Sequence, residues 1–377
     1  MRVRLKSVVF AAVATTVLLS SPSWAIEPNA VARALGAALA QGRQDAVGFT
    51  DAFERGGQIV IRDLTIDLPE GAGTAKFAES VLDAPVENSD GSIAAVSLTM
   101  TSGTIRGNDI NGSINSAMMS DVTILSAETI RAKNLDQGIL YRTATITGFR
   151  FVPKDDFGEI TVEKMEMEAD NFVDYQAQAS RGTVTGLRIP TKNVPPGPIS
   201  PQSLGYEEFI LDFEWDGARD PQTQVTTIDT LAVTLRDGGS ITISGKFGNT
   251  PATRASDPES SMRALTQMSI LALTFRYADD SLAGKILDAA AKQQGTTRQQ
   301  YAQQLSAALP FFLVMIQNPG FQNKVATAIG RFLADPQSLT ISIQPDRPLT
   351  GGEIFGLLQT APQTLPDVLG VVIEANN

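Results

Sequence analysis

A short apolar phrase recurs between Gly57 and Tyr277 and sets the strongest limit on what this chain can fold into. In this phrase, apolar residues stand at positions i, i+3 and i+5, as in Ile61-Leu64-Ile66 and Val184-Leu187-Ile189. In a strand, the later positions share one face, and the first joins them only if a β-bulge intervenes. Repeated bulges curve a sheet and keep one apolar and one polar face. The phrase therefore predicts a long, curved, bulged sheet.

Two topologies fit this pattern. Turn-like segments at 89–92, 154–159 and 236–240 favour a mainly antiparallel meander, because each has the glycine and aspartate content of a hairpin loop. The small polar residues of 129–151 are typical of stacked coils and leave a parallel β-helix segment as the alternative. The proline-rich stretch 189–203 is either a linker between two halves of the sheet or a surface excursion.

Helical spacing appears on both sides of the strand region. Val31 and Leu35 follow Pro28 at helical intervals, which predicts an N-terminal helical segment over 26–56. The repetitive β-region covers 57–277, and 278–377 reads as a helical cap with two short strands. Thr297 and Gln300 form a capping box at the start of one helix of the cap. The expected fold class is α+β, with helices at both ends of the sheet.

The first 25 residues have the layout of a secretory signal peptide. Three basic residues precede an apolar run from Val8 to Leu19, and Ser23 and Ala25 place small residues before a cleavage site after Ala25. The apolar run is shorter than the roughly 20 residues of a spanning helix. We therefore expect a periplasmic or secreted protein with no stable transmembrane segment after cleavage.

Composition excludes several functions. The chain has no histidine and no cysteine, which removes His-dependent triads, His–zinc and haem–His sites, and thiol chemistry. Loss of Arg2, Arg4 and Lys6 with the signal peptide leaves 27 basic residues against 41 acidic ones, a formal charge of −14. This charge opposes binding to nucleic acid.

Paired carboxylates are the remaining catalytic or metal-binding candidates. They occur at Asp155-Asp156, Glu207-Glu208 and Asp279-Asp280, and Glu166 and Glu168 alternate with methionines as on the wet face of a strand. None has EF-hand spacing, and charged runs of this kind are typical of solvated faces. We expect no catalytic residue, no metal site and no cofactor, and thus a protein that is not an enzyme.

The nine apolar residues "ALPFFLVMI" (308–316) interrupt the amphipathic cap. At helical rise they reach about 14 Å, less than half of a bilayer, so we expect a helix end that plugs the apolar side of the sheet. The plug either closes a core permanently or covers a groove. The residues expected to line that groove are Leu309, Phe312, Leu313 and Ile316 of the helix, and Phe149, Phe151, Leu187 and Phe275 of the sheet.

Two functions follow from these expectations. The first is a non-enzymatic envelope protein that binds lipid or another apolar ligand in the groove of the curved sheet. The alternative is a structural or protein-interaction scaffold with a filled core, which binds an envelope protein partner at an edge strand.

The wording "TITGFRF" (145–151), "VTGLRI" (184–189) and "SITISGKFGNT" (240–250) resembles that of the AsmA-like and YdgA-like families of bacterial envelope proteins. "LALTFRYADDSLAGKIL" (271–287) resembles the latter family. The resemblance covers about half of the mature chain and implies a role in envelope lipid homeostasis. It assigns no functional residue. The chain departs from AsmA-like proteins in its short length and its cleavable signal.

Overall fold

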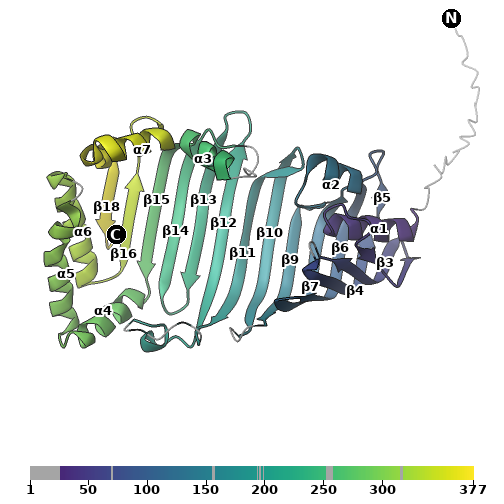
Figure 1. Ribbon diagram of the computed structural model, residues 1–377, viewed down its shortest axis with the longest axis horizontal. Coiled ribbons are helices and arrows are strands. Elements are labelled where there is room, and N and C mark those ends of the chain that lie inside the picture. Colours follow the sequence, from purple (N-terminus) through teal and green to yellow (C-terminus); the bar gives the residue numbers. More distant parts are fainter. Residues whose placement is uncertain are drawn as a thin grey trace, which may run out of the picture.

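The computed structural model describes residues 26–68, 71–154, 158–192, 194, 197, 199–251, 258–314 and 317–377. The expected signal peptide, residues 1–25, lies outside these ranges. The described chain forms one large antiparallel sheet with helices at its ends and edges (Figure 1).

Every strand pairing is antiparallel, so the meander prediction is confirmed and the β-helix alternative is wrong. The main strands lie in chain order across the sheet: β2 (Asp51–Arg55), β3 (Gln58–Asp67), β4 (Gly73–Asp83), β6 (Ile93–Gly107), β7 (Ile110–Ile124), β9 (Thr143–Pro153), β10 (Ile160–Val173), β11 (Gln176–Pro190), β12 (Glu208–Asp220), β13 (Val225–Leu235), β14 (Gly239–Gly248), β15 (Ser269–Asp279), β16 (Ser338–Ile343) and β18 (Val371–Ala375). Four two-residue strands add to their flanks: β1 (Val47–Gly48), β5 (Val86–Glu87), β8 (Ile139–Leu140) and β17 (Leu349–Thr350).

The helices lie around the sheet. They are α1 (Pro28–Leu39), α2 (Ala127–Lys133), α3 (Pro258–Gln267), α4 (Leu282–Gln293), α5 (Arg298–Leu313), α6 (Pro319–Ala334), α7 (Gly351–Thr360) and α8 (Leu365–Val368), with short 3-10 turns η2 (Gln202–Leu204) and η4 (Pro362–Thr364). Figure 1 shows α1 and α2 at the N-terminal end of the sheet and α5 and α6 beyond the last strands. Helices α3 and α7 lie at one edge, where the strands end, and α4 lies at the opposite edge.

Two boundaries differ from the sequence-based division. The segment 26–56 was expected to be helical, but β1 and β2 already belong to the sheet. The C-terminal segment 278–377 contributes β16, β17 and β18 to the same sheet rather than packing as a separate cap. The proline-rich stretch 189–203 does not link two separate halves of the sheet, since β11 and β12 on either side of it pair directly.

The bulges expected from the recurring phrase are present in the middle of the sheet. The pairing register shifts between Val184 and Leu187 in β11 and between Ile228 and Leu231 in β13. Gly186 has a φ of +65°, a left-handed conformation that glycine adopts without strain. Asp63 and Gly148 take similar positive φ values at the same place in their phrases, without a register shift against their neighbours. Each device returns the first apolar residue to the face of the others.

Two rungs of apolar residues consequently run straight across thirteen strands. A rung here is a set of residues that pair directly on successive strands and so share one face of the sheet. Rung 1 consists of Ile59, Leu82, Leu98, Met119, Ala144, Met167, Gly182, Trp215, Leu231, Ile243, Phe275, Ile341 and Ile373. Rung 2 consists of Ile61, Ser80, Met100, Ala117, Ile146, Met165, Val184, Phe213, Val233, Ile241, Tyr277, Leu339 and Ala375.

The main hydrophobic core cluster lies at the N-terminal end of these rungs. Val31 and Leu35 of α1 and Ile130 of α2 are buried against the first strands. There Leu82 and Leu98 of rung 1 are completely buried. The core therefore forms where α1 and α2 cover the apolar face.

Candidate apolar trough

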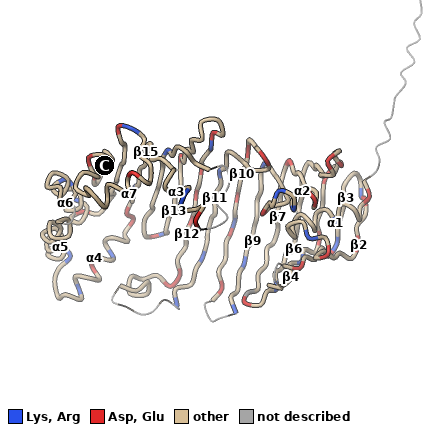
Figure 2. The backbone as a smooth tube through the Cα atoms, turned by 45° about the horizontal axis from the view of Figure 1, so that its top comes forward, with Lys and Arg blue, Asp and Glu red and all other residues tan. Residues whose placement is uncertain are grey.

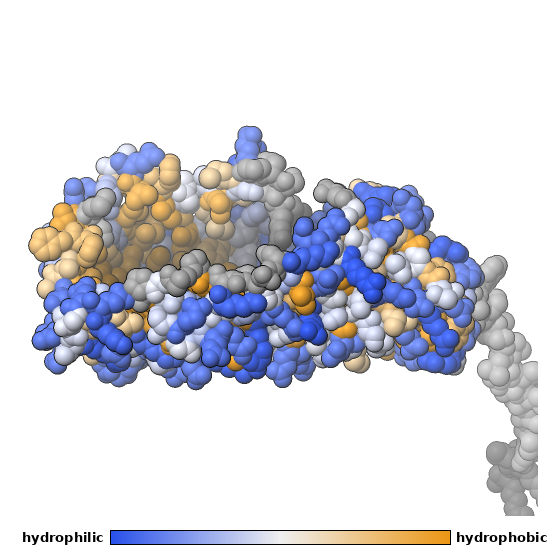
Figure 3. Space-filling model, turned by 60° about the horizontal axis from the view of Figure 1, so that its bottom comes forward, coloured by the Kyte–Doolittle hydropathy of each residue, from blue (hydrophilic) through white to orange (hydrophobic). Residues whose placement is uncertain are grey.

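The apolar face of the sheet is left open between its two covered ends. Leu231 of rung 1 is 43% exposed and Ile241 of rung 2 is 40% exposed, although Leu98 in the same rung as Leu231 is fully buried. Figure 3 shows the surface hollowed and hydrophobic over this part of the molecule. We call the apolar face from β10 to β15 the trough.

Helix α6 closes the C-terminal end of the trough. Its Phe332 packs edge-to-face on Tyr277 of rung 2, with 5.9 Å between the ring centres. Tyr277 also donates a hydrogen bond to Asp279, and burial together with this bond raises the pKa of the phenol. The wall at this end is thus aromatic.

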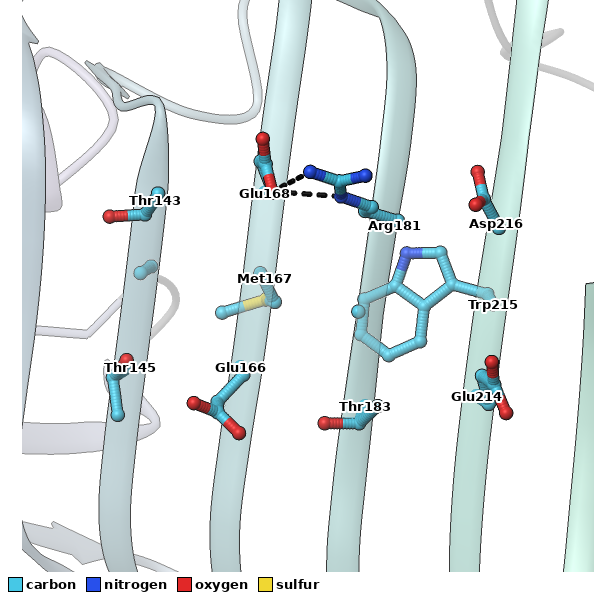
Figure 4. A pocket seen from close by; sticks show the side chains of 12 residues that line it. Thr143, Thr145, Glu166, Met167, Glu168, Arg181, Thr183, Glu214, Trp215 and Asp216 are labelled. Atoms are coloured by element: carbon cyan, nitrogen blue, oxygen red, sulfur yellow. Dashed lines mark hydrogen bonds and ion pairs between the residues drawn. The ribbon is translucent and has the colours of Figure 1, made fainter.

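Trp215 lies at the centre of the trough floor, beside the gap that Gly182 leaves in rung 1. A Cβ placed on Gly182 would meet the indole Cζ2 at 2.3 Å, so the ring lies over the glycine backbone. Met167 flanks the same position on β10, and Figure 4 shows the indole reaching from β12 across β11. A cavity of about 370 Å³ at these strands is lined mainly by residues of the opposite face, among them Glu166, Glu168 and Arg181. The glycine makes room for the largest side chain of the trough.

The opposite face of the sheet is polar and charged. Lys164 pairs with Glu166 at 2.7 Å and Arg181 with Glu168 at 2.6 Å, on side chains that are exposed except for the half-buried Glu168. Figure 2 shows acidic and basic residues interleaved along the strands of this region. The expectation that Glu166 and Glu168 lie on a wet strand face is confirmed.

The other acidic pairs also have structural partners. Glu208 pairs with Arg188, and Asp279 accepts from Tyr277 and from the backbone N–H of Ala283. Asp155 and Asp156 lie outside the described residues. Within the described ranges, no group of three or more acidic side chains is arranged to hold a metal ion.

The four sheet residues expected to line a groove share the apolar face. Leu187 pairs with Leu211 beside rung 2, and Phe275 belongs to rung 1. Phe149 and Phe151 stack with their ring centres 6.5 Å apart on β9, at the N-terminal border of the trough. All four side chains are half-buried.

The expected helical plug is wrong. Phe312 is 73% exposed, and α5 packs chiefly against α6 and α4 rather than the sheet. Leu309 and Leu313 are half-buried in α5, and Ile316 lies outside the described residues. The reason is that α6 takes the place against β15 to β18, so α5 stacks behind it and its apolar end projects into solvent.

Sequence reasoning missed most of the trough floor. Met165, Met167, Trp215, Leu231 and Ile241 were not expected to line a site. The sequence did contain a signal for these residues, because most of them belong to the recurring apolar phrase. Which phrases end up uncovered depends on where α1 and α6 pack, and no local pattern encodes that.

Comparisons with known proteins add little to this geometry. A family model described as an uncharacterized protein matches residues 232–376, from β13 to the C-terminal strand. No curated protein and no solved structure matches the chain. None of these findings supports the resemblance to AsmA-like and YdgA-like proteins.

Proposed function

We propose that the protein is an exported, non-enzymatic binding protein that holds a lipid or another apolar ligand in the trough. The observation that carries the proposal is the contrast along one rung: its N-terminal members are sealed under α1, and its central members are open. Soluble proteins rarely leave a contiguous apolar surface uncovered unless something binds there.

The dimensions of the trough suit an acyl chain. Strands lie about 4.8 Å apart, so the six strands from β10 to β15 span roughly 24 Å. A bilayer core of about 30 Å makes one extended acyl chain roughly 15 Å long. An acyl chain laid along a rung would cover Leu231, Ile241 and their neighbours, at about 25 cal/mol for each Å² removed from water.

The lining favours a flexible apolar ligand over a rigid polar one. Met165 and Met167 supply adaptable side chains, and Trp215, Phe213 and Phe275 supply broad apolar surfaces. Charged side chains point to the other face of the sheet. The headgroup of a bound lipid would lie at the rim of the trough. The alternative function, a scaffold with a filled core, gains no support from this lining.

The proposal is tested by lipid retention. Protein purified without detergent from its native compartment is extracted with organic solvent, and the extract is analysed by mass spectrometry. We expect stoichiometric lipid in the wild type and its loss in Ile241→Glu, because a carboxylate in the trough must be desolvated when a chain binds.

Thr242→Glu is the matched control. Thr242 is the next residue of β14, pairs with Arg276 and Ala232, and points to the polar face. This variant adds the same charge one residue away and is expected to retain lipid. Absence of lipid from the wild type, or equal retention in both variants, contradicts the proposal.

A further inference from the structure

Seven exposed apolar side chains gather at one edge of the sheet. They come from three helices that are distant in sequence, and each is more than half exposed: Met262 and Leu265 of α3, Phe311, Phe312 and Val314 at the end of α5, and Phe355 and Leu358 of α7. We call this set the apolar edge. In Figure 3, hydrophobic surface continues from the hollow onto the lobes that border it.

Specific contacts bring the three helices to the same edge. The backbone N–H of Gly351, at the start of α7, donates to the carbonyl of Met268, just after α3. The Asn318 amide, at the turn between α5 and α6, donates to the carbonyl of Gln363 and to the carboxylate of Asp367, each at 3.0 Å. The end of α5 is therefore tied to the turn that follows α7.

The apolar edge carries no surplus of charge. The chain has no charged residue between Arg298 and Lys324, a stretch that includes the whole apolar end of α5. In the described parts of α3 and α7, Arg263 pairs with Glu259 and Glu353 with Arg347. Basic clusters recognise anionic headgroups, and this edge lacks them.

The opposite edge is polar. There Lys285 of α4 donates to the carbonyl of Asp237, and Arg298 pairs with Asp288. The molecule thus has one apolar and one charged edge on either side of the same trough. This asymmetry would orient the molecule, apolar edge first, on a surface with a neutral outer layer and a hydrophobic interior.

We propose that the apolar edge docks on a lipid bilayer and inserts the Phe311, Phe312 and Phe355 rings below the headgroups. Exposed aromatic and aliphatic side chains at the tips of a rigid rim bind membranes in proportion to the apolar area they bury. The inference rests on the proposed function, since docking at this edge sets one side of the trough against the source or destination of its lipid.

Flotation with neutral phosphatidylcholine vesicles tests the docking step. The wild type is expected to float with the vesicles, and binding should be unchanged between low and high salt because no charge pairing is involved. The double variant Phe311→Ser/Phe312→Ser should bind at least about tenfold more weakly, since each buried phenylalanine contributes roughly that factor or more.

The control variant is Val96→Ser/Met118→Ser. Val96 and Met118 are 59% and 54% exposed on β6 and β7, far from the edge, and their loss should leave flotation unchanged. Equal flotation of the two variants, or flotation only with anionic vesicles, overturns the proposal. It is also overturned if the wild type does not bind vesicles but forms a concentration-dependent dimer that Phe311→Ser/Phe312→Ser abolishes.

Lipid content separates this proposal from the proposed function. Ile241→Glu should still float, and Phe311→Ser/Phe312→Ser should still hold lipid when loaded from detergent. A wild type that carries lipid but does not float refutes docking alone. A wild type that floats but carries no lipid refutes the trough as a lipid site and leaves the docking edge standing.

Discussion

At the residue scale, one buried serine interrupts the apolar side chains of the rungs. Ser80 of rung 2 is fully buried between Ile61 and Met100. Its hydroxyl has no hydrogen-bond partner. Burying an unpaired hydroxyl costs about 1–3 kcal/mol, so Ser80 weakens the core that α1 covers.

Ser80→Ala is expected to raise the free energy of unfolding by about 1 kcal/mol, because it removes the unpaired group at little loss of volume. The measurement is the urea midpoint by circular dichroism. Ser92→Ala is the control, since Ser92 is also buried but donates to Asp90 at 2.7 Å and accepts from Asn88 at 2.9 Å. That variant should lose stability, and a loss of equal size in Ser80→Ala would show that its hydroxyl is bonded.

At the element scale, the helices decide which part of one continuous face becomes core. Helix α1 buries Val31 and Leu35 on the first strands, and α6 sets Phe332 on Tyr277 near the last. Between them the strands keep the same apolar pattern without a cover. A single sheet therefore contains a sealed core and an open trough.

Two leucines of rung 1 measure this difference. Leu98→Ala should destabilise the protein by about 2–5 kcal/mol, as for a fully buried leucine. Leu231→Ala should cost about 1 kcal/mol or less, because the side chain is already 43% exposed. Unfolding midpoints in urea provide the comparison. Similar losses for the two variants would mean that the centre of the face is covered in solution.

The strands could be predicted from sequence because alternation and turn residues act locally. The hairpin loops at 89–92 and 236–240 and the capping box of Thr297 and Gln300 all appear where expected. Helix α2 was missed, since its seven residues are too few for a clear period and its Ser126 cap lies within strand-like wording. The prediction of a helical plug was wrong for a non-local reason. Either of two apolar helices could pack on the same surface of the sheet, and the sequence does not indicate that α6 packs there instead of α5.

At the scale of the whole molecule, the trough, its end walls and the apolar edge form a single device. The sheet supplies a rigid floor, α1 and α6 close the ends, and α3, α5 and α7 provide the rim that we propose meets a membrane. In the described part of the chain, no helix has the length and apolarity to cross a bilayer.

The most direct test of the trough uses Trp215 as a reporter. The chain has two tryptophans, Trp24 in the expected signal peptide and Trp215 on the trough floor. In a Trp24→Phe protein loaded with phosphatidylcholine brominated on its acyl chains, we predict strong quenching of Trp215 fluorescence relative to the unbrominated lipid. Equal fluorescence with both lipids would mean that no acyl chain enters the trough, and would contradict the account.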